Sequence, residues 1–321
     1  MRPSRGVWYW PSLLLLLVAV AGLGGCSSAA WQSPTSEVLK PRLVVITTTS
    51  LVSGLVRDVA GDRVEVRQIV PPGADAVAYR PPANVTGLLD GADVTFHHGL
   101  GLETGLGSFL AVAAGTGPVV GVADTIPPDR LLPPDGNGTA VSAAVWLDPA
   151  LWTLALERVT DALVDLDPGA ADTYRARTSA AGVRYAELSR YLAGTFAMVP
   201  GARRVVATTD GGLSYLLAPH GFTVAVLPST ASRPWPTAAE AGLIADAAIG
   251  TGAAVVLVPA RTQASANAVL TSALSERGSR VSVLPVTLDS LGRAGSLEAD
   301  YEATMRGLSE LIMVALVVEG G

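Results

Sequence analysis

The sequence predicts an α/β protein with two doubly wound α/β lobes joined by one long, rigid α-helix. In both halves of the chain, short runs of β-branched residues alternate with helical patterns, as in parallel sheets covered by helices. Between the halves, residues 169–198 lack proline and have only Gly182 and Gly194 as internal glycines. A helix of about 30 residues would be roughly 45 Å long, which suits a connector between lobes.

The first residues form an export signal. Arg2 and Arg5 precede an apolar run at 13–21, which is shorter than the roughly 20 residues of a membrane-spanning helix. Small residues then lead to Cys26 in a pattern like a bacterial lipobox. A plain secretory signal with a stray cysteine is the alternative. We expect a signal peptide at 1–25, a lipid on Cys26 and a lipidated tether at 26–41.

That signal implies an extracytoplasmic protein anchored to the cell membrane as a lipoprotein. Cys26 is the only cysteine, so no intrachain disulfide is expected. The formal net charge is −6, and removal of Arg2 and Arg5 makes it more negative. An acidic chain is a poor partner for nucleic acid. We expect a monomer.

The N-terminal lobe is predicted at residues 42–166. Continuous β-branched runs predict buried parallel strands at 42–46, 64–70, 94–96 and 119–120. Helical spacing predicts helices at 50–60, 85–89, 106–112 and 149–166. Asp148 is a suitable N-cap for the last of these, and Pro149 suits its first turn.

The linking helix is predicted at residues 167–199. Asp167 and Pro168 repeat the start signal of the preceding helix. Two helices broken near Gly182 are the alternative to one continuous helix. The C-terminal lobe is predicted at 200–321. Its strands are expected at 204–207, 223–227, 254–258 and 281–286, and its helices at 213–218, 237–250, 264–277 and 297–318.

Signatures of catalysis are absent from the sequence. It has no Gly-x-Ser-x-Gly elbow, no Walker loop and no dinucleotide-binding glycine pattern after a strand. The histidines are His97, His98 and His220, with no partner nearby in sequence that would make a catalytic triad. We expect a binding protein and not an enzyme.

Three stretches resemble the substrate-binding lipoproteins of zinc and manganese (metal) ABC transporters. They are GDRVEVRQIVPPGADAVAYRP, DGADVTFHHGLGLE and AAVWLDPALW, and the resemblance extends from about residue 42 to the end. It implies two α/β lobes, a metal-type solute site between them and delivery of the solute to an ABC transporter permease. The implied solute is a divalent metal ion such as zinc or manganese, and no resident cofactor is expected.

The resemblance also implies four ligand positions. A histidine of the first family motif corresponds to Val77, and a histidine before Val-Trp-Leu-Asp-Pro corresponds to Ala144. The third position, five residues before Tyr215, is Asp210, and the fourth is Asp289 in LDSLG. Both imidazole positions of the first lobe are therefore occupied by apolar residues in a member that diverges from its family.

This ligand set predicts a degenerate or altered metal site. Zinc favours nitrogen and sulfur donors, whereas two carboxylates with water suit calcium, magnesium or manganese. The alternative is a family member that binds no metal. It would act as a surface interaction protein or bind another solute, such as a metal chelate.

Several other residues are predicted to lie near the cleft. Arg80 would either point into it and compete with a cation or lie solvated on the loop rim. Adjacent strand residues face opposite ways, so at most one of His97 and His98 can face the cleft, and His98 is a candidate metal ligand. The remaining predicted cleft neighbours are Tyr79, Thr209 and Trp235.

Overall fold

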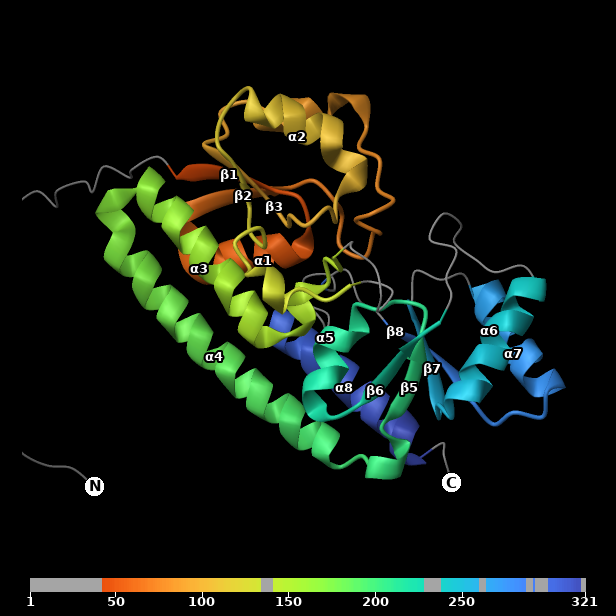
Figure 1. Cartoon of the computed structure of the whole chain (residues 1–321). Helices are drawn as coiled ribbons and strands as arrows, with labels where there is room; N and C mark the ends of the chain where they lie inside the picture. The colour runs from red at the N-terminus through yellow and green to blue at the C-terminus, as the bar shows by residue number, and fades with distance from the viewer. Residues whose placement is uncertain are drawn as a thin grey trace, which may run out of the picture. The chain divides into compact units, whose positions relative to one another are not determined.

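Two four-stranded parallel sheets with helices packed against them form the described part of the chain (Figure 1). The structure is a computed structural model and describes residues 42–133, 141–227, 238–259, 264–286, 291 and 300–318. The first sheet has the order β2-β1-β3-β4 and contains β1 (Leu43–Thr47), β2 (Val64–Gln68), β3 (Val94–His97) and β4 (Val119–Gly121). The second has the order β6-β5-β7-β8 and contains β5 (Val205–Thr208), β6 (Thr223–Val226), β7 (Val255–Pro259) and β8 (Ser282–Val286).

All pairings in both sheets are parallel, which confirms the predicted fold class. Val45 of β1 lies opposite Val66 of β2 and Val94 of β3. In the second sheet, Ala207 of β5 lies opposite Ala225 of β6 and Val256 of β7. The strand order reverses between β1 and β3 and again between β5 and β7. In open parallel sheets, ligands bind at the carboxyl ends of the strands beside such reversals.

The first sheet is covered on both faces. Successive strand residues alternate between two apolar clusters: Val45 packs with α1 (Ser50–Ala60), and Ile46 packs with α2 (Gly107–Ala114). Figure 1 shows α1 and α2 on opposite sides of this sheet. The short helix expected at 85–89 is a 3₁₀ helix spanning Ala83–Leu89.

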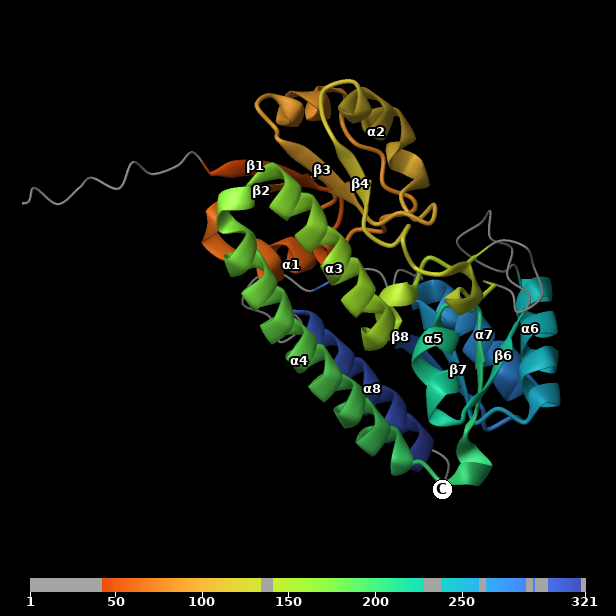
Figure 2. The same ribbon diagram turned by 60° about the vertical axis from the view of Figure 1, so that its left-hand side comes forward.

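The linking helix is continuous. Helix α3 (Pro149–Leu166) is capped by Asp148, whose carboxylate accepts a hydrogen bond from the Ala150 amide at 2.8 Å, as predicted. After a 3₁₀ turn, α4 (Ala171–Ala197) runs for 27 residues through Gly182 and Gly194, a length of about 40 Å. The two-helix alternative is wrong. Figure 2 shows α4 beside α3 and α8.

The second sheet is also packed on two sides. Its helices are α5 (Leu213–Leu217), α6 (Ala238–Thr251), α7 (Ala264–Glu276) and α8 (Tyr301–Val318). Ala207 and Val256 pack with α6 and α7, whereas Val206 and Val255 join the cluster that contains α8. Among the described residues, none of the helices has the length and apolar run needed to cross a bilayer.

The largest apolar cluster is shared by the two lobes. It contains Val45 and Phe96 of the first sheet, Val206 and Leu257 of the second, and Tyr185 of α4. Residues 41–321 accordingly form one compact unit. The lobe boundaries at 42–166, 167–199 and 200–321 stay predictions, because the packing is continuous across them.

Candidate functional site

The candidate site lies at the carboxyl ends of β1, β3 and β5. These strands lie beside the two points at which the strand order reverses. Thr48 to Ser50 follow β1, His97 ends β3 and Asp210 follows β5. In parallel sheets these carboxyl ends are where a doubly wound fold places its ligands. The polar residues at these three ends are therefore the first candidates for contacts to a solute.

Asp210 is held by a tight turn between β5 and α5. The hydroxyl of Thr208 accepts a hydrogen bond from the Asp210 amide at 3.0 Å. The Asp210 carboxylate accepts one from the Gly212 amide at 2.9 Å. Thr209, between them, is half-buried. Local side-chain-to-backbone bonds of this kind fix the direction of the carboxylate.

The absence of a side chain at Gly212 leaves room for three other residues to lie close together around it. A Cβ placed on Gly212 would lie 2.5 Å from the Ala144 Cβ, 3.0 Å from Asp210 Oδ1 and 3.2 Å from Ser142 Oγ. Any side chain at 212 would therefore collide with its neighbours. The structure thus brings together Ala144 and Asp210, two of the four implied ligand positions, with Ser142 beside them.

Tyr215 connects this cluster to the N-terminal lobe. Its hydroxyl accepts a hydrogen bond from the Leu132 amide at 2.7 Å and donates one to the Ser142 carbonyl at 3.3 Å. Burial raises the pKa of the Tyr215 hydroxyl, which stays protonated and can keep donating. The tyrosine therefore keeps residues 142–144 against the turn that carries Asp210.

The first family motif forms a loop shaped by Asp75. Its carboxylate accepts hydrogen bonds from the amides of Val77 at 2.9 Å and Ala78 at 3.2 Å. Ala76 is buried, Tyr79 packs on the apolar cluster beneath α2, and Val77 is 42% exposed. The loop has a defined shape, and position 77 lies on its surface.

Arg80 folds back onto its own loop. Its Nη1 donates to the carbonyls of Ala78 at 3.1 Å and Tyr79 at 3.2 Å, with the Val77 carbonyl at 3.5 Å. A Cβ on Gly105 would lie 2.1 Å from the Tyr79 carbonyl oxygen and 2.2 Å from Arg80 Nη1, so only glycine allows this close approach. Of the two predicted alternatives, the Arg80 side chain therefore lies on the rim of the loop and does not point into the cleft.

Replacing Arg80 should leave cation binding almost unchanged. The exposed guanidinium bonds to loop carbonyls, so Arg80→Ala should change the affinity for manganese by no more than about twofold. Isothermal titration of the variant beside the natural chain measures this. A tenfold gain in affinity would instead mean that the guanidinium competes with the cation in the cleft.

A buried carboxylate, Glu103, organises the end of β3. Its Oε1 accepts hydrogen bonds from the Thr48 hydroxyl at 2.5 Å and the His98 amide at 2.6 Å, and its Oε2 lies 3.9 Å from His97 Nδ1. Burial alone would raise the pKa of Glu103, but the interactions with His97, His98 and Thr48 outweigh it and lower the pKa. Glu103 joins the ends of β1 and β3 beside the candidate site.

The ring of His98 is buried in the core. It stacks on Trp152 at 5.7 Å and meets Trp146 edge-on at 5.1 Å between ring centroids. Its Nδ1 lies 3.1 Å from the Gly99 carbonyl, and Nε2 has no hydrogen-bond partner among the described residues. This packing favours a structural role for His98 over the predicted role as a metal ligand.

Glu103, Ser142 and Gly212 were not assigned roles from the sequence. Glu103 stands in a motif that carried the resemblance, so an acidic residue six positions after the strand-end histidine His97 was an available signal. The proximity of Ser142 and Gly212 arises only from tertiary packing. Cys26, Trp235 and Asp289 lie outside the described residues. Within the described ranges, no three His, Cys, Asp or Glu side chains are grouped to hold a metal ion.

Comparison with protein families gives a match over almost all of the folded chain. The family model described as "Zinc-uptake complex component A periplasmic" matches residues 45–315. This range begins within β1 and contains the other strands of both sheets, α4 and the cluster around Gly212.

Individual proteins show the same similarity. The zinc-binding protein TroA of Treponema pallidum is 28% identical over 219 residues, covering 68% of this chain and 70% of TroA. The manganese-binding lipoprotein MntA of Bacillus subtilis is 25% identical over 315 residues, covering 94% and 97%. The solved structure of the periplasmic zinc-binding protein TroA superposes with a TM-score of 0.76 at 26% identity, covering 86% of this chain and 99% of that one.

Proposed function

The chain belongs to the family of zinc-uptake complex component A periplasmic proteins, and from this membership we propose that it is a lipid-anchored, monomeric solute receptor with an altered metal site. It is a substrate-binding protein of a metal ABC transporter and not an enzyme, as the sequence predicts. Its partner is the transporter permease. The proposed anchor is a lipid on Cys26, as in the lipoproteins that the chain resembles.

One observation carries the proposal of an altered site. Ala144, at a position implied to be histidine, has its Cβ in the same confined space as the Asp210 carboxylate. The second such position is Val77, so neither residue supplies an imidazole. The remaining donors are oxygens, which suit hard cations such as manganese, magnesium or calcium better than zinc.

Asp289 is the proposed second carboxylate. Two residues further on, the Leu291 amide donates to the hydroxyl of Ser50 at 2.9 Å, and the Leu291 side chain is buried. Ser50 begins α1 directly after the carboxyl end of β1. The chain next to Asp289 therefore reaches the ligand-binding edge of the first sheet, which supports a role for Asp289 in the cleft.

Calorimetric titration tests the proposal. The purified protein should bind manganese, and its affinity for zinc should exceed that for manganese by far less than in a site with imidazole ligands, because the proposed ligands are carboxylate oxygens. Asp210→Ala should weaken manganese binding by at least about tenfold. Asp246→Ala is the matched control, since Asp246 pairs with Arg277 on the outer helices and should leave the affinity unchanged.

The same titration decides between the two predicted functions. If manganese, magnesium, calcium and zinc all produce no binding heat, the altered metal site is wrong. A surface interaction protein or a receptor for a metal chelate would then be the better interpretation. Equal losses in Asp210→Ala and Asp246→Ala would also contradict the assignment of Asp210.

A further inference from the structure

The Ser142 hydroxyl and the Asp210 carboxylate lie around one point of the candidate site. A Cβ built on Gly212 would lie 3.2 Å from Ser142 Oγ and 3.0 Å from Asp210 Oδ1, with the Ala144 Cβ at 2.5 Å. Ser142 belongs to the segment before α3, whereas Asp210 belongs to the turn after β5. Two oxygen donors from distant parts of the sequence therefore meet beside the implied ligand position 144, which carries only a methyl group.

Ser142 is held in place by several hydrogen bonds. Its amide donates to the Leu132 carbonyl at 2.7 Å, and its carbonyl accepts a hydrogen bond from the Tyr215 hydroxyl at 3.3 Å. Its own hydroxyl oxygen accepts one from the Ala144 amide at 3.3 Å. The residue is buried, with 7% of its surface exposed. Because these bonds already fix the direction of the hydroxyl, little further ordering would be needed when a cation binds.

A hydroxyl oxygen has the right chemistry to share a cation with a carboxylate. Hard cations such as manganese, magnesium and calcium favour oxygen ligands, from carboxylates, carbonyls and water alike. A histidine at position 144 would bring a nitrogen donor toward Asp210, but alanine cannot. Ser142, two residues earlier, brings an oxygen there instead, which makes the site more favourable for a hard cation.

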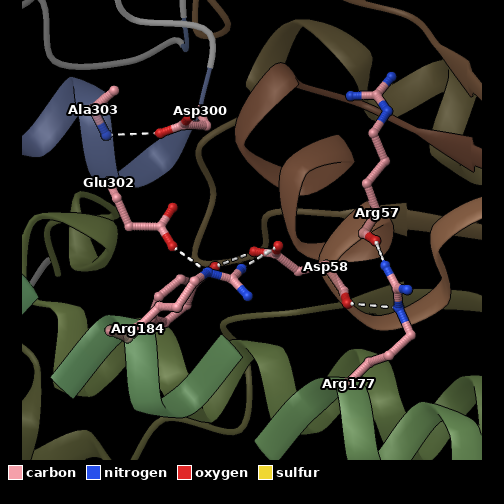
Figure 3. Close-up of polar contacts among 8 residues, drawn as sticks. Arg57, Asp58, Arg177, Arg184, Asp300, Glu302 and Ala303 are labelled. Atoms are coloured by element: carbon pink, nitrogen blue, oxygen red, sulfur yellow. Dashed lines mark hydrogen bonds and ion pairs between the residues drawn. The ribbon is translucent and has the colours of Figure 1, made fainter. Parts of the chain in front are cut away.

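A group of carboxylates outside the candidate site is paired with arginine. Nη2 of Arg184 lies 2.5 Å from Asp58 Oδ1, and its Nε lies 2.6 Å from Glu302 Oε1. Both carboxylates line a cavity of about 460 Å³ beside α4. Figure 3 shows the guanidinium between them, where a cation would have to bind. This cluster is therefore a poor cation site, and the convergence of Ser142 and Asp210 stays the better candidate.

We propose that Ser142 is a ligand of the altered site and that its hydroxyl binds the same divalent cation as Asp210. The inference rests on the proposed function, because it requires the solute to be a metal ion bound at Asp210. It adds a determinant of specificity that the four implied ligand positions do not include, an uncharged oxygen beside the position that has lost its imidazole.

Calorimetric titration with manganese gives the first test. Ser142→Ala removes the hydroxyl oxygen and should weaken manganese binding by about tenfold. Ser309→Ala is the matched control, because Ser309 is a buried serine of α8 whose hydroxyl donates to the Arg306 carbonyl at 2.8 Å. This control removes the same atom from a residue outside the candidate site and should leave the affinity unchanged.

A cysteine at this position distinguishes a ligand from a merely structural residue. In a chain carrying Cys26→Ser, Ser142→Cys places sulfur where the hydroxyl oxygen was, and thiolate is a strong ligand for transition metals. Titration with cobalt should then produce the sulfur-to-cobalt charge-transfer absorption of a bound thiolate, whereas Ser309→Cys should not. Adding Asp210→Ala to Ser142→Cys should weaken cobalt binding by at least about tenfold, because both residues hold the same ion.

The outcomes separate this inference from the proposed function. If Asp210→Ala weakens manganese binding but Ser142→Ala does not, Ser142 is not a ligand and the proposed function stands. Cobalt bound to Ser142→Cys without the charge-transfer absorption would also overturn the inference, and this measurement applies even where Ser142→Ala fails to fold. If the natural chain binds neither manganese nor cobalt, the inference and the proposed metal site are both wrong.

Discussion

The double variant Val77→His, Ala144→His should bind zinc about a thousandfold more tightly than the natural chain. Four-ligand zinc sites in peptides bind with apparent free energies of about 10–16 kcal/mol. If the two imidazoles contribute only about 4 kcal/mol together, the affinity rises about a thousandfold. The glycine at 212 leaves the Ala144 Cβ facing Asp210, so a new imidazole there can share a cation with the carboxylate.

Competition titration with a zinc-binding dye measures this gain. The matched control, Ala78→His with Ala143→His, adds the same two imidazoles one residue away from the implied ligand positions. We expect little gain in the control. Similar zinc affinities for the double variant, the control and the natural chain would mean that Val77 and Ala144 do not occupy ligand positions.

Much of the fold is determined by local patterns in the sequence. The continuous apolar strands and the absence of proline between 169 and 198 are sufficient to predict two parallel sheets and one linking helix. The lobes' shared core is different, because Val45 and Val206 join one cluster only through packing across α4 and α8. Periodicity shows which face of a helix or strand is apolar, but it does not show which other element packs against that face.

The candidate site was predictable where a motif fixes a position. Counting five residues back from Tyr215 identifies Asp210, and the hydroxyl of Tyr215 explains the spacing by holding residues 132 and 142. The contacts of Arg184 could not be predicted, since its two partners are 126 and 118 residues away. Their charges look like ordinary solvated helix surface in the sequence.

The buried His98 should make the protein less stable in mild acid. Burial between Trp146 and Trp152 lowers the pKa of His98, despite the opposing charges of Glu103 and Asp124. In the folded state the ring stays neutral, whereas in the unfolded state it gains a proton below about pH 6.5. The unfolded state then binds more protons, so the free energy of unfolding falls as the pH falls.

The expected loss between pH 6.5 and pH 5 is at most about 2 kcal/mol, the limit for one proton taken up only on unfolding. Urea unfolding at a series of pH values in this window measures it, above the range in which most carboxylates titrate. His98→Asn should lower the overall stability but flatten the dependence on pH. His220→Asn is the control, because burial also lowers the pKa of His220, which is less enclosed and should contribute less. If the free energy of unfolding of His98→Asn falls with pH as steeply as that of the natural chain, the proton is taken up by another group. The buried His98 would then not determine the stability in acid.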